Sequence, residues 1–179
     1  SLGKSYVMRM YIKEKIEQYG DGNFTIVVPT KALINEVTAN ITEDLGNSLY
    51  EKNYRIVTSA GAVALEEKHH FIFVMTPERL LYLLILLPDM PMEYLFVDEA
   101  HKISQQDDRS AYYYKIVDML AKRKHAPHII FASPNIPNPD VYLQLVTEKG
   151  EGENFNLRTR FSPVNQEKFL IDCKEHNLY

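Results

Sequence analysis

Short apolar runs alternate with longer amphipathic segments along most of the chain. The runs are rich in β-branched and aromatic residues, and they fall at positions 24–28, 54–58, 71–75, 94–97 and 128–132. Near-continuous apolar runs are typical of strands that are buried on both faces of a parallel sheet. When strands alternate with helices, the helices cover both faces of that sheet. The pattern therefore predicts an α/β domain with a mainly parallel sheet between two helical layers.

The segments between the runs have apolar residues at helical spacing. We predict helices over residues 6–19, 32–45, 80–87, 111–123 and 140–147. The third of these is almost entirely apolar, so we expect most of its faces to be buried. The apolar faces predicted for the others are Val7, Met10, Tyr11 and Ile16 in the first helix, Leu33, Ile34, Val37, Ile41 and Leu45 in the second, and Tyr112, Ile116, Met119 and Leu120 in the fourth.

Two adjacent carboxylates, Asp98 and Glu99, follow the fourth apolar run directly. In an open α/β sheet, ligands bind at the carboxyl ends of the strands. Side chains alternate in direction along an extended segment, so one carboxylate can hold a cation while the other faces water or a substrate. This arrangement suits phosphoryl transfer, in which catalysis consists mostly of positioning and charge neutralisation. A solvated strand end without any chemistry is the alternative.

The sequence Gly3-Lys4-Ser5 stands directly before the first predicted helix. Backbone N–H groups at a helix N-terminus bind phosphate. A lysine there can reach the terminal phosphates of a nucleotide, and a serine hydroxyl can bind magnesium. The full phosphate-loop pattern needs another glycine five positions before Gly3, so we interpret the chain as a fragment whose first strand is missing. A polar helix cap with a solvated lysine is the alternative.

The first apolar run ends at Pro29, Thr30 and Lys31. Proline closes the strand, and threonine is suited to cap the helix that follows. A Thr–Lys pair on a helix N-terminus at the edge of the sheet can hold a nucleic-acid phosphate. A plain helix cap beside an exposed lysine fits these residues equally well. The third run ends in a similar way, with Thr76 suited to be the N-cap and Pro77 the first helical residue.

Composition and charge bound the class of protein. The chain has 179 residues, 45% of them apolar and 25% charged, as in an ordinary globular domain. Its net charge of -4 argues against nucleic-acid binding by bulk electrostatics, but permits a grip on the backbone through a few local groups. The single cysteine excludes an intramolecular disulfide, which fits a cytoplasmic protein. We expect neither a membrane span, which needs about 20 apolar residues, nor a secretory leader.

The polar signatures at the strand ends occur in an order that is typical of one family. They are Gly3-Lys4-Ser5, Pro29-Thr30-Lys31-Ala32-Leu33, Thr76-Pro77-Glu78-Arg79, Val97-Asp98-Glu99-Ala100-His101 and Phe131-Ala132-Ser133. Together they resemble the first RecA-like motor domain of superfamily 2 helicases of the DEAD/DEAH-box kind. The resemblance covers residues 1 to about 146. It implies a three-layer α/β/α RecA-like domain of the P-loop NTPase class, over residues 1–149. Residues 150–179 would be an extension or a linker toward a second motor domain.

The resemblance also implies a role for each signature, with ATP and Mg²⁺ as cofactors. Gly3 and Lys4 would bind the phosphates, and Ser5 would coordinate magnesium. Asp98 would hold the magnesium, and Glu99 would orient or deprotonate the attacking water.

Three further groups of residues acquire roles by the same resemblance. His101 would border the nucleotide and couple its site to the partner domain. Pro29, Thr30, Lys31, Thr76 and Arg79 would lie along the nucleic-acid track and contact sugar and phosphate. Ser133 would link hydrolysis to strand separation. DNA is favoured weakly over RNA as the bound polymer, because the Pro-Thr-Lys-Ala-Leu run together with DEAH looks like DNA-directed members.

The sequence departs from the family pattern in three places, of which the first is the missing first half of the phosphate loop, along with any upstream adenine-reading segment. The last motif usually reads Ser-Ala-Thr, whereas here it reads Ser133-Pro134-Asn135, which puts the coupling contacts in doubt. The second motor domain and its arginine finger are absent from the chain. We therefore expect the isolated fragment to hydrolyse ATP poorly, since loss of an arginine finger costs on the order of 10³–10⁵ in rate in related enzymes.

Two other functions are compatible with these motifs. One is the motor of an ATP-driven duplex DNA translocase from a restriction or defence system, which would not separate strands. The other is a binding or scaffold module that kept the fold without catalysis. The intact Lys4, Asp98 and Glu99 argue against the scaffold.

Overall fold

A five-stranded parallel sheet forms the centre of the domain. The structure is a computed structural model that describes residues 3–61, 69–104, 109–133, 171–172 and 177–178. The strand order is β2-β3-β1-β4-β5, and every neighbouring pair is parallel. The predicted parallel sheet is confirmed, and each strand begins and ends within one residue of its predicted range. The strands are β1 (Phe24–Val27), β2 (Tyr54–Val57), β3 (His70–Met75), β4 (Tyr94–Val97) and β5 (His128–Phe131).

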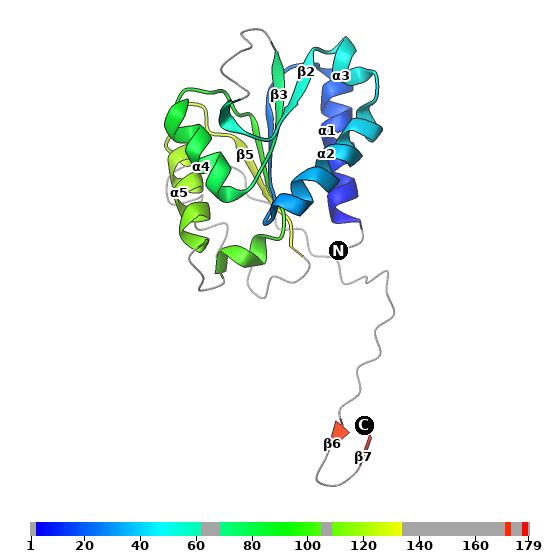
Figure 1. Cartoon of the computed structure of the whole chain (residues 1–179), viewed down its shortest axis with the longest axis vertical. Coiled ribbons are helices and arrows are strands. Elements are labelled where there is room, and N and C mark those ends of the chain that lie inside the picture. Colours follow the sequence, from blue (N-terminus) through cyan, green and yellow to red (C-terminus); the bar gives the residue numbers. More distant parts are fainter. Residues whose placement is uncertain (1–2, 62–68, 105–108, 134–170, 173–176, 179) are drawn as a thin grey trace.

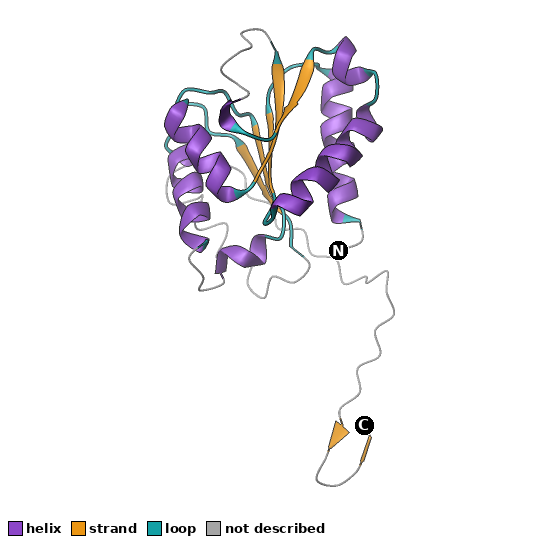
Figure 2. Ribbon diagram, viewed as in Figure 1, coloured by secondary structure: helices purple, strands orange, loops and turns teal. Residues whose placement is uncertain are grey.

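Helices cover both faces of this sheet, which confirms the predicted three layers. Helices α1, α2 and α3 lie on one side and α4 and α5 on the other (Figures 1 and 2). The helix expected over residues 140–147 falls outside the described residues. Within those residues, no helix has the length and apolar character that crossing a membrane requires. The helices are α1 (Lys4–Gln18), α2 (Lys31–Leu45), α3 (Ser48–Glu51), α4 (Pro77–Leu86) and α5 (Ser110–Ala121), with a 3₁₀ helix, η2 (Ala100–Ser104), between β4 and α5.

Two short strands occur near the end of the chain. They are β6 (Ile171–Asp172) and β7 (Asn177–Leu178), and they pair with each other in an antiparallel sheet separate from the five strands.

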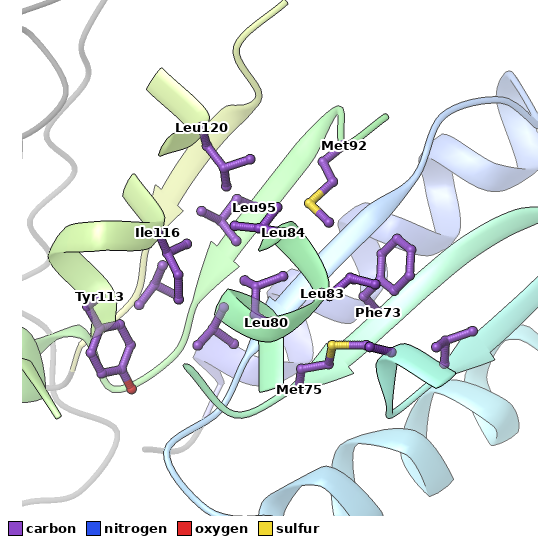
Figure 3. Close-up of a cluster of buried hydrophobic side chains, with 14 of the residues drawn as sticks. Phe73, Met75, Leu80, Leu83, Leu84, Met92, Leu95, Tyr113, Ile116 and Leu120 are labelled. Atoms are coloured by element: carbon purple, nitrogen blue, oxygen red, sulfur yellow. The ribbon is translucent and has the colours of Figure 1, made fainter. Parts of the chain in front are cut away.

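Each face of the sheet carries its own hydrophobic core. Phe24 and Ile26 of β1 point toward α1 and α2 and are fully buried. The next residue, Val27, belongs to the opposite core because side chains alternate along a strand. Figure 3 shows that second core, in which Leu80 and Leu83 of α4 lie among side chains from β3, β4 and α5. Burial on both faces explains why the three central strands, β3, β1 and β4, lack an alternating polar pattern. The edge strands β2 and β5 are partly exposed, contrary to the prediction of burial on both faces.

The buried face of α1 differs from the predicted one. Met8, Ile12 and Ile16 are buried, whereas Val7 is 66% exposed and Tyr11 is 37% exposed. The buried residues are spaced by four and therefore lie on one stripe of the helix. A second apolar stripe runs beside it, and hydrophobic periodicity alone did not distinguish the two. The second helix was predicted correctly, since four of its five predicted apolar residues are fully buried.

The outer helices α4 and α5 also correct the sequence analysis. On α4, Tyr82, Ile85 and Leu86 are at least half exposed, so the expectation that most of its faces are buried is wrong. This helix packs on the sheet and α5 with one face only. On α5, Ile116 and Leu120 are buried as predicted, but Tyr113 and Val117 join them in place of Tyr112 and Met119. The buried stripe of α5 is therefore rotated by about one residue.

The N-terminus of α2 depends on a side-chain cap that can be tested. Thr30 has extended backbone angles, and its Oγ1 accepts a hydrogen bond from the backbone N–H of Leu33 at 3.3 Å. We expect Thr30→Ala to lower the free energy of unfolding by about 1 kcal/mol, because one helix amide loses its partner. Urea denaturation measures this change. Thr42→Ala is the matched control, since the Thr42 hydroxyl only donates back to the Thr38 carbonyl within the helix. There we expect no loss, because alanine is the better helix former.

Candidate functional site

Asp98 and Glu99 lie at the carboxyl edge of the sheet, where β1 to β5 end and α1, α2 and η2 begin (Figure 1). The backbone N–H of Asp98 donates to the Val27 carbonyl at 3.0 Å, which continues the β1–β4 ladder by one residue. Its side chain is buried, and Asp98 Oδ1 accepts a hydrogen bond from the backbone N–H of Glu99 at 2.9 Å. The chain then turns sharply into η2. The two carboxylates therefore occupy the strand end that the sequence predicted.

The turn after β4 requires an unusual backbone conformation at Glu99. Its φ angle is 54°, in the left-handed region that side chains other than glycine rarely adopt. Such a residue costs on the order of 1–3 kcal/mol and persists only where the surroundings hold it in place. Here Asp98 holds the Glu99 amide, and the Ala100 amide donates to the Ala132 carbonyl at 2.9 Å. The Glu99 carboxylate that follows from this turn lies next to His101.

Lys4 and Ser5 lie beside Asp98 although they are more than 90 residues away in sequence. Burial raises the pKa of Asp98 above its usual value of 3.8, and the nearby Glu99 carboxylate raises it further. The Glu99 amide, the Lys4 charge and a hydrogen bond from the Ser5 hydroxyl oppose this rise. Because the pKa of Asp98 is higher in the folded state than in the unfolded state, protonation of Asp98 stabilises the fold. This stabilisation is lost as the pH rises through the folded-state pKa. A bound cation would offset the free-energy cost of ionising the buried Asp98 carboxylate.

The start of α1 is suited to hold an anion. Gly3 has a φ of 104°, a conformation that demands glycine, and its carbonyl accepts the first helical hydrogen bond, from the Val7 amide at 2.9 Å. No side chain caps this helix, and its first turn contains no acidic residue. Its first amides and partial positive charge therefore face the carboxyl edge without a built-in anion.

His101 connects the Glu99 carboxylate to the end of β5. Its Nδ1 lies 3.2 Å from Glu99 Oε2 and 3.1 Å from Ser133 Oγ. The Ala132 amide donates to the Val97 carbonyl at 2.9 Å, which holds the two strand ends together. The structure thus brings Glu99, His101 and Ser133 into one contact chain. A single imidazole ring therefore lies between Ser133 and Glu99.

The residues predicted to lie on the nucleic-acid track differ in their exposure. Thr30 and Lys31 are exposed at the start of α2, whereas Pro29 is buried. Thr76 is only 4% exposed, and its hydroxyl hydrogen-bonds the Glu78 carboxylate. The five residues share the carboxyl edge, but Pro29 and Thr76 offer little side-chain surface to a polymer.

Arg79 is held by a hydrogen bond within the domain. Its Nη1 donates to the Thr58 carbonyl, at the end of β2, at 2.9 Å. Part of this guanidinium is therefore used inside the domain.

Comparison with known families agrees with this geometry. The family model described as DEAD/DEAH box helicase matches residues 1–141. The chain belongs to the DEAD/DEAH box helicase family. No curated protein matches its sequence.

Two solved helicase structures are similar to this helicase domain in fold. The Pyrococcus furiosus Hef helicase domain has a TM-score of 0.59 at 20% sequence identity, with 81% of this chain and 31% of that chain covered. A structure of a variant of S. cerevisiae Dbp5 bound to RNA and ADP BeF3 has a TM-score of 0.56 at 12% identity, with 87% and 39% covered. The chain thus spans about a third of the length of these structures. The likeness establishes the predicted RecA-like α/β/α fold.

The sequence analysis missed two residues at the carboxyl edge of this helicase domain. Glu78 and Arg109 form an ion pair with 2.6 Å between Glu78 Oε1 and Arg109 Nε. Neither residue stands out in sequence, because Glu78 reads as an ordinary first-turn acid and Arg109 lies in a polar loop. Only their proximity in space, across a sequence separation of 31 positions, reveals the link. Pro134 and Asn135, which depart from the family pattern, lie outside the described residues.

Proposed function

We propose that this domain is the N-terminal ATP-binding motor domain of an ATP-dependent nucleic-acid helicase. The observation that carries the proposal is the interaction of Asp98 with the Ser5 hydroxyl, by a hydrogen bond, and with the charge of Lys4. It brings together the two segments that would form the nucleotide site. Taken alone, the Gly3-Lys4-Ser5 segment can be explained as a polar helix cap, and Asp98 with Glu99 as a solvated strand end. A solvated strand end would not bury Asp98 beside a lysine and a hydroxyl from another element.

The residues at this edge fit magnesium and a triphosphate. The Ser5 hydroxyl and the Asp98 carboxylate are hard oxygen donors, which Mg²⁺ prefers, and it keeps further positions for water and phosphate. Within the described residues, no three His, Cys, Asp or Glu side chains gather as a metal cluster, and Mg²⁺ bound with a nucleotide does not need one. Bound magnesium supplies charge neutralisation on the phosphates. Gly3 and Lys4 would contact those phosphates through the uncapped amides and the ammonium group.

Glu99 would then orient or deprotonate the attacking water. Its carboxylate lies beside His101, and its charge is close enough to that of Asp98 to raise the pKa of Asp98. The His101 ring contacts both Glu99 and Ser133. It would couple the nucleotide site to the partner domain. The departure from the family pattern at residues 134–135 directly follows Ser133 in the sequence.

Thr30, Lys31 and Arg79 would hold the backbone of the nucleic acid, with Pro29 and Thr76 shaping the loops beneath it. We propose DNA as the first polymer to test and RNA as the second. The second RecA-like domain, reached through residues 150–179, would complete the site beyond the ATP-binding domain over residues 1–149. A cytoplasmic location is part of the same proposal.

Stimulation of ATPase activity by nucleic acid tests the function. Hydrolysis is measured with single-stranded DNA, duplex DNA or RNA, in the longest form of the protein that carries this domain. We expect one polymer to raise the rate several-fold, because binding along the carboxyl edge completes the site. Strand displacement on a tailed duplex then separates a helicase from a duplex translocase. A rate that is unaffected by all three polymers would contradict the proposal.

A further inference from the structure

Arg109 joins segments that come from opposite faces of the sheet. It stands immediately before α5, and its Nε donates to Glu78 Oε1, in the first turn of α4, at 2.6 Å. Its Nη1 donates to the Pro29 carbonyl, in the loop between β1 and α2, at 2.7 Å. Pro29 is 80 positions away in sequence. One guanidinium therefore connects the starts of α2, α4 and α5 at the carboxyl edge.

This connection extends along the edge through Arg79. The residue after Glu78 donates from its own guanidinium to the Thr58 carbonyl, at the end of β2. The loops after β1 and β2 are thus tied to the first turn of α4 by two neighbouring residues. Glu78 and Arg79 act from one turn of helix, so a shift of that turn would move both ties together.

The proposed nucleic-acid contacts fall into two groups, which lie in different helical layers. Thr30 and Lys31 begin α2, which packs on one face of the sheet, whereas Arg79 belongs to α4 on the other face (Figure 1). A polymer backbone has regular phosphate spacing, so a track that uses both groups needs a set distance between them. The Glu78–Arg109–Pro29 link crosses the carboxyl edge between the two layers.

The environment keeps Glu78 in the ionised form that this link requires. Burial alone would raise its pKa, but hydrogen bonds from its own backbone amide, the Thr76 hydroxyl and Arg109, with the charge of Arg109, lower the pKa below its usual value. The pair is nevertheless substantially exposed, with 46% of the Arg109 side chain and 33% of the Glu78 side chain accessible. Ion pairs with such exposure contribute little to global stability. Breaking this one should leave the fold intact.

We propose that the Glu78–Arg109 pair is a positioning device that sets the spacing between the nucleic-acid-contacting starts of α2 and α4. This proposal rests on the proposed function, because the residues that the pair positions are proposed nucleic-acid contacts. It assigns no direct contact with the polymer to Glu78 or Arg109. Both are positioning residues that act through Thr30, Lys31 and Arg79.

The Glu78→Gln variant is a useful test, because simple electrostatics and the positioning role predict opposite changes in the affinity for nucleic acid. The substitution removes a negative charge from the carboxyl edge and frees Arg109, so simple electrostatics predicts tighter binding to a polyanion. Positioning predicts weaker binding, by about fivefold, the equilibrium change that one exposed ion pair can produce. Binding is measured by fluorescence anisotropy on the full chain, with a labelled single-stranded DNA and the matching RNA, in the presence of Mg²⁺ and a non-hydrolysable ATP analogue.

Further readouts separate positioning from unfolding and from direct phosphate contact. The affinity for the ATP analogue and the thermal midpoint should stay at the wild-type values, because none of the contacts described above joins Glu78 to Lys4 or Asp98 and the exposed pair contributes little to stability. The slope of log affinity against log salt should also be unchanged, whereas Lys31→Ala should reduce it by about 1. Asp44→Asn is the charge-matched control, since it also removes a partly exposed acid from an ion pair, with Arg9 of α1.

Three results of these measurements would support or overturn the positioning role. Weaker polymer binding by Glu78→Gln, with unchanged nucleotide affinity and no such loss in Asp44→Asn, supports the positioning role. Equal or tighter binding, while Lys31→Ala still loses affinity, overturns it and leaves the proposed function standing. Absence of polymer binding by the wild-type chain, with DNA and with RNA, overturns the proposed function and this inference with it.

Discussion

Replacing Glu99 by glutamine is expected to slow ATP hydrolysis by about 10²- to 10⁴-fold, the range for loss of a positioned general base. Glutamine keeps the size of the side chain and an oxygen that can face His101, but it cannot accept a proton from water. Nucleotide binding should persist, since Lys4, Ser5 and Asp98 are unchanged. Single-turnover hydrolysis and titration with a fluorescent ATP analogue measure the two effects separately.

Glu17→Gln is the control for this experiment. Glu17 lies on the exposed side of α1, in an i,i+4 pair with Lys13. The same chemical change there should leave both hydrolysis and binding at wild-type levels. If Glu99→Gln hydrolyses ATP as fast as the wild type, Glu99 is not the residue that activates water, and the enzymatic function proposed above fails.

Lys4→Ala is expected to weaken binding of Mg–ATP by about 10- to 100-fold, which corresponds to the loss of a hydrogen bond between charged groups. A second effect should accompany it. The Lys4 charge lowers the pKa of Asp98, so its removal allows that pKa to rise further. Asp98 must be ionised to hold magnesium, and the loss of affinity should therefore become larger as the pH falls. Isothermal titration at several pH values measures both effects.

Lys13→Ala is the matched control, because it removes a lysine from the exposed side of the same helix. It should change neither the affinity nor its pH dependence. A Lys4→Ala variant that binds Mg–ATP like the wild type would show that the start of α1 does not hold phosphate. The effect of the Lys4 charge on Asp98 would then be structural only.

The sheet and the convergence of its polar strand ends could be predicted because both depend on local patterns. Runs such as 94–97 are apolar throughout, and in a parallel sheet their carboxyl ends must meet at one edge. The placement of Lys4 and Ser5 beside Asp98 follows from the same rule. The roles of these residues in catalysis stay predictions.

The parts that could not be predicted depend on packing. In α1, apolar residues form two adjacent stripes, so the sequence alone did not show that Met8 is buried and Val7 exposed. Thr76 is buried and its hydroxyl hydrogen-bonds Glu78, and neither fact follows from its position before a helix. The bond from Arg109 to Pro29 joins two loop residues with no periodicity, and nothing in the sequence marks them as neighbours.

The left-handed backbone at Glu99 has a consequence for the history of this position. On stability alone, glycine or asparagine would occupy it at lower energy than glutamate. A lineage that retains the acid therefore keeps a residue that the turn itself disfavours. Relatives freed from the need to cleave a nucleotide would be expected to drift toward glycine or asparagine here, so the residue at this site records whether selection for chemistry is still at work.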